Sequence, residues 1–71
     1  MATVLVVRTG EELEFTDTTI TFYIFMEPNS TIILGNNVIV QKNIWGPGNI
    51  SISGNVTMNA SIGVYPGDPA L

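Results

Sequence analysis

The side chains that most often carry catalysis are missing from this chain, so the chemistry open to it is narrow. Its 71 residues include neither His nor Cys. The usual general base, the thiol nucleophile and the common zinc ligands are therefore all absent. We predict that the protein is not an enzyme, that it has no catalytic residue, and that it binds neither a metal ion nor a cofactor.

Carboxylates are the reactive groups that remain. Glu12 and Glu14 flank Leu13 in an alternating segment, so a strand would place both carboxylates on one face. They can be interpreted as a paired acid or a calcium site, or as a solvated outer face whose charges discourage edge-to-edge strand pairing. We favour the solvated face. Asp17 lies among threonines and is interpreted as a turn residue whose side chain caps its own backbone.

Trp45, the only tryptophan, stands next to the turn sequence Gly46-Pro47-Gly48. This turn lacks the Lys-Ser/Thr pair and the following helix of a phosphate-binding loop. A tryptophan beside polar amides can stack on a sugar ring, cover the end of its own core or anchor a protein interface. We predict an interface role for Trp45, with glycan binding as the alternative.

Net charge and hydropathy argue against two classes of partner. Six acidic residues face only Arg8 and Lys42, which gives a net charge of −4 and no basic surface to hold phosphates. No apolar run approaches the roughly 18 residues of a membrane span, and the N-terminus does not resemble a secretory signal. We therefore expect no nucleic-acid or membrane partner and synthesis in the cytoplasm.

The chain is short enough to need help with its core. Seventy-one residues make one domain at most, and a domain of this size buries only about 60% of the surface its unfolded chain exposes. Without disulfides or a structural metal, oligomerisation is the remaining remedy. Charged residues make up 11% of the chain, against roughly 25% in ordinary soluble domains. Much of its surface is therefore expected to face copies of itself or other structural subunits.

Strand signals run along the whole sequence, and helix signals are missing. No stretch shows a clean 3.6-residue period, whereas β-branched residues are frequent. Residues 3–8 are apolar on both faces, which predicts a strand that is covered on both sides. Further short predicted strands, some apolar throughout and some alternating, follow between turn residues: 13–15, 20–26, 32–34, 38–40, 50–52 and 56–58. The fold class predicted is all-β without helices.

These runs form an internal repeat of 18 to 19 residues. The alignment sets Leu13-x-Phe15 and Ile20-x-Phe22 against Ile32-x-Leu34 and Val38-x-Val40, and these against Ile50-x-Ile52 and Val56-x-Met58. The second and third copies agree in detail, since each has a Gly-Asn element between its two strands. The first copy shares only the apolar pattern.

Two geometries fit this repeat unit. A three-residue hairpin loop, Ser53-Gly54-Asn55, with Asn55 in the left-handed conformation would give an antiparallel sandwich or barrel. The same residues could instead bend the strand at the corner of a short β-solenoid built from coils of about 18 residues. We prefer the solenoid. Residues 13–64 resemble the coil repeats of parallel β-helix proteins such as viral tailspikes and bacterial surface adhesins, a resemblance that implies an architecture and no catalytic residue.

The end of the chain differs in composition from the rest. Residues 65–71 hold two prolines and a glycine and cannot continue a central strand, so we predict one all-β domain over residues 1–64 and an extended tail over 65–71. This tail is either a disordered end or an arm in which Tyr65 and Leu71 dock onto a neighbouring subunit. The predicted interface residues are thus Trp45, Tyr65 and Leu71.

Low charge, small size and strands apolar on both faces are typical of a repeated subunit. We expect a structural protein of a large assembly, such as a viral capsid shell or its decoration or stabilising protein, located in the virion. The alternative is an adhesin or glycan-binding module at an extracellular surface. Four Asn-x-Ser/Thr sequons, at Asn29, Asn49, Asn55 and Asn59, would be glycosylated in a secreted eukaryotic protein, or follow simply from turn asparagines beside Ser/Thr-rich strands.

Overall fold

A computed structural model of the chain describes residues 3–60, which form nine short strands and no helix. The predicted tail, with Tyr65 and Leu71, lies outside the described residues, as does the end of the predicted domain, 61–64. The strands are β1 (Val4–Val7), β2 (Glu12–Phe15), β3 (Thr18–Ile20), β4 (Tyr23–Met26), β5 (Thr31–Leu34), β6 (Val38–Val40), β7 (Ile44–Trp45), β8 (Asn49–Ile52) and β9 (Val56–Met58).

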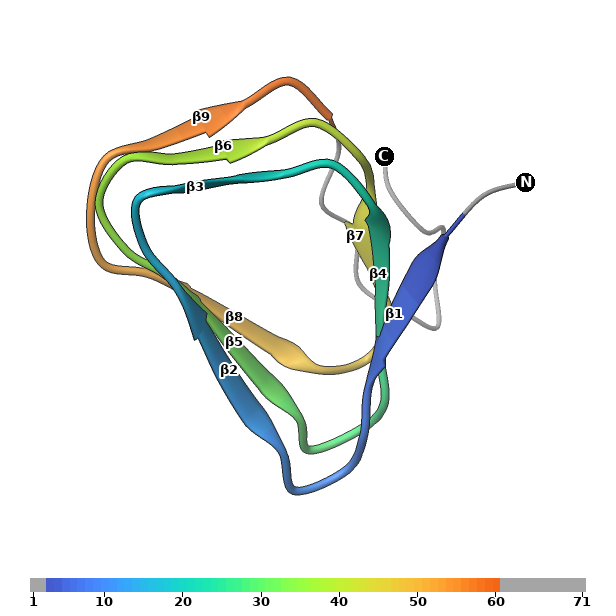
Figure 1. Cartoon of the computed structure of the whole chain (residues 1–71). Coiled ribbons are helices and arrows are strands. Elements are labelled where there is room, and N and C mark those ends of the chain that lie inside the picture. Colours follow the sequence, from blue (N-terminus) through green and yellow to red (C-terminus); the bar gives the residue numbers. More distant parts are fainter. Residues whose placement is uncertain (1–2, 61–71) are drawn as a thin grey trace.

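The strands build three parallel sheets, one on each side of a triangle (Figure 1). Sheet A has the order β1-β4-β7, sheet B β2-β5-β8 and sheet C β3-β6-β9. Each turn of the chain adds one strand to every sheet, so the first coil is β1 to β3, the second β4 to β6 and the third β7 to β9. This is a short β-solenoid, as the sequence predicted, and parallel pairing excludes the antiparallel alternative.

The strand register confirms the repeat between the second and third coils. Leu13 pairs with Ile32 and Ile32 with Ile50, which are 19 and 18 residues further along the chain. In the first coil, however, Ile20 pairs with Val40 and not with Val38, as the alignment had assumed. Only residues 16 and 17 separate β2 from β3, whereas three residues separate the corresponding strands in the other coils.

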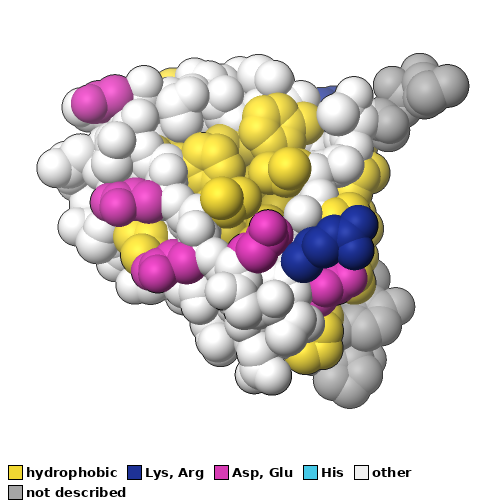
Figure 2. All heavy atoms as spheres, turned by 60° about the horizontal axis from the view of Figure 1, so that its bottom comes forward, with side chains coloured by type: hydrophobic (Ala, Val, Ile, Leu, Met, Phe, Trp, Pro, Cys, Tyr) yellow, Lys and Arg dark blue, Asp and Glu magenta, His cyan; other side chains and the backbone are white. Residues whose placement is uncertain are grey.

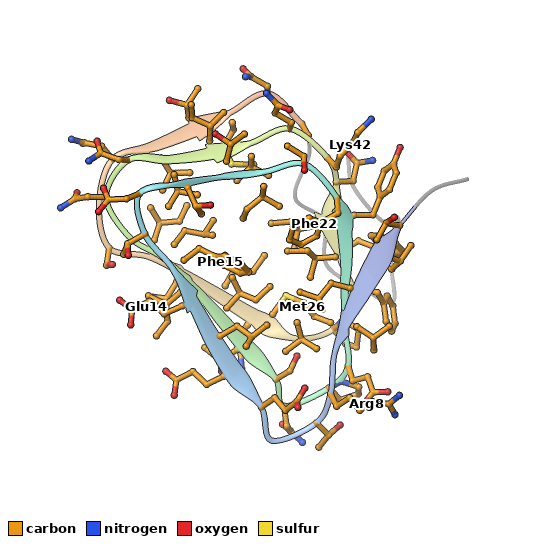
Figure 3. The ribbon with its side chains drawn as sticks, in the orientation of Figure 1. Arg8, Glu14, Phe15, Phe22, Met26 and Lys42 are labelled. Carbon is orange, nitrogen blue, oxygen red and sulfur yellow. The ribbon has the colours of Figure 1, made fainter. Side chains whose placement is uncertain are left out.

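Alternating side chains point into the triangle and form one core. The inner side chains of the second coil are at most 1% exposed: Ile24, Met26, Ile32, Leu34, Val38 and Val40. Figure 3 shows Phe15, Phe22 and Met26 directed inward, and Arg8, Glu14 and Lys42 directed outward. The end coils are less well covered, and Ile52 of the third coil is 56% exposed. Burial therefore falls from the middle of the stack towards its ends.

Asparagine and aspartate side chains link the coils where sheet B turns into sheet C. Asn37 Nδ2 donates to Asp17 Oδ1 at 2.8 Å, and the Asn55 backbone N–H donates to Asn36 Oδ1 at 3.0 Å. Asp17 and Asn37 have φ values of 53° and 60°, in the left-handed region that Asn and Asp tolerate. Asn55 is not among the left-handed residues, which excludes the alternative in which it closes a hairpin loop. It belongs to a solenoid corner.

Candidate interaction surface

The outer sides of the three sheets differ in chemistry. Sheet B presents Glu12, Glu14, Thr31, Ile33, Asn49 and Ser51, and sheet C presents Thr19, Ile39 and Thr57. Sheet A presents Val4, Val6, Tyr23, Phe25 and Trp45, which we call the aromatic face. Within residues 3–60 it is the one outer sheet side that carries aromatic rings.

The backbone register brings the residues of the aromatic face together. Val4 pairs with Tyr23, Val6 with Phe25, and Phe25 with Trp45. The Trp45 ring lies 5.5 Å from the Phe25 ring between centroids and meets the Tyr23 ring edge to face at 6.4 Å. Both spacings are typical of favourable aromatic pairs. Trp45 therefore contacts both other rings and joins them into a single surface.

This surface is only partly covered. Val4 and Val6 are 45% and 39% exposed, and the three rings are half-buried. At its border the Lys42 ammonium lies 5.5 Å from the centre of the Tyr23 ring, a cation–π distance. The sequence predicted that the first strand is covered on both faces. In the described residues its inner face is covered and its outer face is not.

Of the three predicted interface residues, Trp45 lies on the aromatic face, while Tyr65 and Leu71 are outside the described residues. The sequence reasoning missed Tyr23, Phe25 and the two valines as partners of Trp45. One signal was present, since residues 4–7 and 22–26 are apolar at consecutive positions. In a solenoid strand only the inward-facing side chains have to be apolar. A strand that is apolar at every position therefore also has an apolar outer side, and two such strands in one sheet indicate an apolar outer surface.

The acidic pair Glu12 and Glu14 lies on the outer side of sheet B. Glu12 and Glu14 are exposed on β2, where their neighbours in register are Thr31 and Ile33. No group of three or more His, Cys, Asp or Glu residues within residues 3–60 could hold a metal ion. The exposed position fits the predicted solvated face.

Two further carboxylates serve the corner between sheets A and B. Glu11 Oε1 accepts the Arg8 backbone N–H at 2.8 Å. Glu27 Oε1 accepts the Thr9 N–H at 2.9 Å from the next coil. These carboxylates fix backbone at the corner, which is a structural role.

The two ends of the stack are a second apolar feature. Inner side chains of the first coil, among them Leu13 and Phe15, and of the third coil, among them Val56 and Met58, are only partly buried. Figure 2 shows hydrophobic side chains gathered in the middle of one face, with acidic side chains on both sides of them. Each end thus exposes part of the core.

The comparisons with known proteins found no counterpart. No family model, no curated protein and no solved structure matches the chain. Among the described residues there is also no helix of the length and hydropathy needed to cross a membrane. The function must therefore be inferred from the surfaces themselves.

Proposed function

We propose that the protein is a structural subunit of a large assembly, of the kind found in a viral capsid shell or its decoration. The observation that carries the proposal is the aromatic face, where Val4 and Val6 stand exposed beside three rings. Aromatic residues are enriched at the centres of protein interfaces, where charged residues are depleted. The five residues of this face are uncharged, and Lys42 lies at its border.

The uneven burial of the core supports the same proposal. Nine hydrophobic residues are fully buried, and they come mainly from the second coil. Coils at both ends gain burial only if something covers them, because each repeat of a solenoid buries its apolar side against a neighbour. Docking into an assembly would stabilise the subunit by mass action, since the assembled neighbours bind its folded state and not its unfolded state.

The aromatic face can be tested with the double variant Val4→Thr/Val6→Thr, which keeps the β-branched shape and removes apolar surface. The matched control is Ile39→Thr, on the outer side of sheet C, because Ile39 is 36% exposed. We expect the double variant to dissociate at higher concentration than the unmodified protein in analytical ultracentrifugation, and Ile39→Thr to associate normally. Trp45, as the only tryptophan, reports the same event by a red shift of its emission on dilution. Equal association of all three proteins would contradict a role for the aromatic face.

A glycan-binding module remains the second candidate, and the resemblance to adhesin coils belongs with it. It is favoured by the outward position of the Tyr23 and Trp45 rings beside Lys42. Aromatic rings next to polar groups can stack on sugars. Titration with neutral and acidic oligosaccharides would then change Trp45 emission in a saturable way. A flat titration up to millimolar sugar would remove this candidate.

A further inference from the structure

We infer that a second copy of this chain stacks on the C-terminal end of the solenoid with its own first coil, so that β8 pairs with β2 and β9 with β3 of the next copy. The inference names a partner for the proposed structural role and rests on that role. It uses the ends of the stack and not the aromatic face. The two surfaces can therefore be tested separately.

The internal register defines how the two ends would meet. Leu13, Ile32 and Ile50 are stacked in sheet B, as are Phe15, Leu34 and Ile52. Continuing the same ladder sets Ile50 and Ile52 against Leu13 and Phe15 of the next copy. In sheet C it sets Val56 and Met58 against Thr18 and Ile20. Three of these four pairs join two apolar side chains. Ile52 is 56% exposed, and Leu13 and Phe15 are only partly buried, so the contact would cover all three.

Backbone groups continue in the same way. The Phe15 carbonyl accepts the Gly35 N–H, and the Leu34 carbonyl accepts the Ser53 N–H, both at 2.8 Å. The Ile52 carbonyl is next in this series and would accept the Thr16 N–H of the second copy. A two-residue corner already stacks on a three-residue corner between the first and second coils, where Phe15 pairs with Leu34 and Thr18 with Val38. The two-residue corner of the second copy can therefore stack on the three-residue corner of the third coil.

Charge favours head-to-tail stacking over contact between two N-terminal ends. The first coil and its corners carry four exposed acidic residues, Glu11, Glu12, Glu14 and Asp17, against one exposed basic residue, Arg8, whereas residues 44–60 carry no charged side chain. Two N-terminal ends would bring like charges together, which is destabilising. In the head-to-tail arrangement Glu12 and Glu14 lie beside Asn49 and Ser51 of the neighbouring copy, without repulsion.

Symmetry separates head-to-tail stacking from contact between two C-terminal ends. If two C-terminal ends meet, a twofold axis perpendicular to the solenoid axis relates the two copies. This axis sets one sheet against the same sheet of the second copy and sets each of the other two sheets against the other. Sheet B therefore cannot extend sheet B of the second copy while sheet C extends sheet C. Translation along the solenoid axis matches both sheets in parallel. Such heterologous contacts do not close and produce chains of subunits.

Ser51 provides a test by charge. Ser51 is exposed on the outer side of β8. In the stacked arrangement it lies beside Glu14 of the next copy. Within its own chain, Glu14 is two strand spacings away, which is roughly 10 Å. We expect Ser51→Lys to lower the dissociation constant about two- to fivefold and Ser51→Glu to raise it by a similar factor, as for exposed ion pairs. High salt should reduce both effects. Ile39→Lys and Ile39→Glu, on the second coil, are the matched controls.

Sedimentation of the full chain across a dilution series gives the readout. Mass that rises with concentration without stopping at a dimer, with opposite effects of Ser51→Lys and Ser51→Glu, supports stacking. A mass that stops at twice the subunit, or equal effects of both Ser51 variants, overturns it. If association responds to Val4→Thr/Val6→Thr but not to Ser51, stacking fails and the proposed structural role stands. A monomer at every concentration overturns both.

Discussion

Two glycines in corners of the solenoid have left-handed backbone, and only one of them lies against another coil. Gly10 has φ 86° and nothing within 4 Å of the place where a Cβ would be. Gly46 has φ 120°, and a Cβ there would meet the backbone of Met26. Both positions favour glycine by conformation, since other residues pay strain at such φ values. Gly46 adds a close approach between the second and third coils.

Alanine substitutions at the two glycines distinguish the cost of backbone strain from the cost of a steric clash between coils. Gly10→Ala should lower the free energy of unfolding by about 1–2 kcal/mol, through backbone strain alone. Gly46→Ala should cost at least about 3 kcal/mol, because the added methyl group also pushes the third coil away from Met26. Urea unfolding followed by circular dichroism measures both. Equal losses in the two variants would show that the coils are not in contact at Gly46.

At the scale of elements, the sequence predicted the strands better than the surfaces. The spacing of Ile32 and Ile50 gave the solenoid register because inner positions of stacked coils must all be apolar. The register of β3 was missed because the alignment set Ile20 against Val38, two positions before its partner Val40. A shift of two residues keeps the same side chains on the inner face, so the apolar pattern does not reveal it. The aromatic face was missed as a unit because it joins residues about 20 apart, such as Val6 and Phe25 or Phe25 and Trp45, that only the stack brings together.

The decline in burial from the middle coil to the ends can be measured with one type of substitution. Ile32 and Ile52 both point inward in sheet B, and they are 0% and 56% exposed. Ile32→Val should cost about 0.5–1.5 kcal/mol through the cavity it leaves. Ile52→Val, at concentrations where the protein is monomeric, should cost less than about 0.5 kcal/mol. Equal costs would mean that the third coil is covered as well as the second.

For the whole molecule, the same apolar pattern explains both folding and dependence on neighbours. A solenoid coil has two sides along the stack, and within residues 3–60 the second coil is the one that has both sides covered by other coils. Outward-facing apolar residues on sheet A add a third uncovered surface, lateral to the stack. The molecule thus has one direction for stacking and one for lateral contact, which together would suit a subunit of an extended lattice.

Stability should therefore depend on protein concentration. If association covers the ends or the aromatic face only in the folded state, each tenfold increase in concentration above the dissociation constant adds up to about 1.4 kcal/mol to the free energy of unfolding. For a domain of this size that raises the melting temperature by several degrees. Differential scanning calorimetry over a hundredfold range of concentration measures the slope. Val4→Thr/Val6→Thr should reduce it and Ile39→Thr should not, whereas a melting temperature independent of concentration would show that the three coils are complete without neighbours.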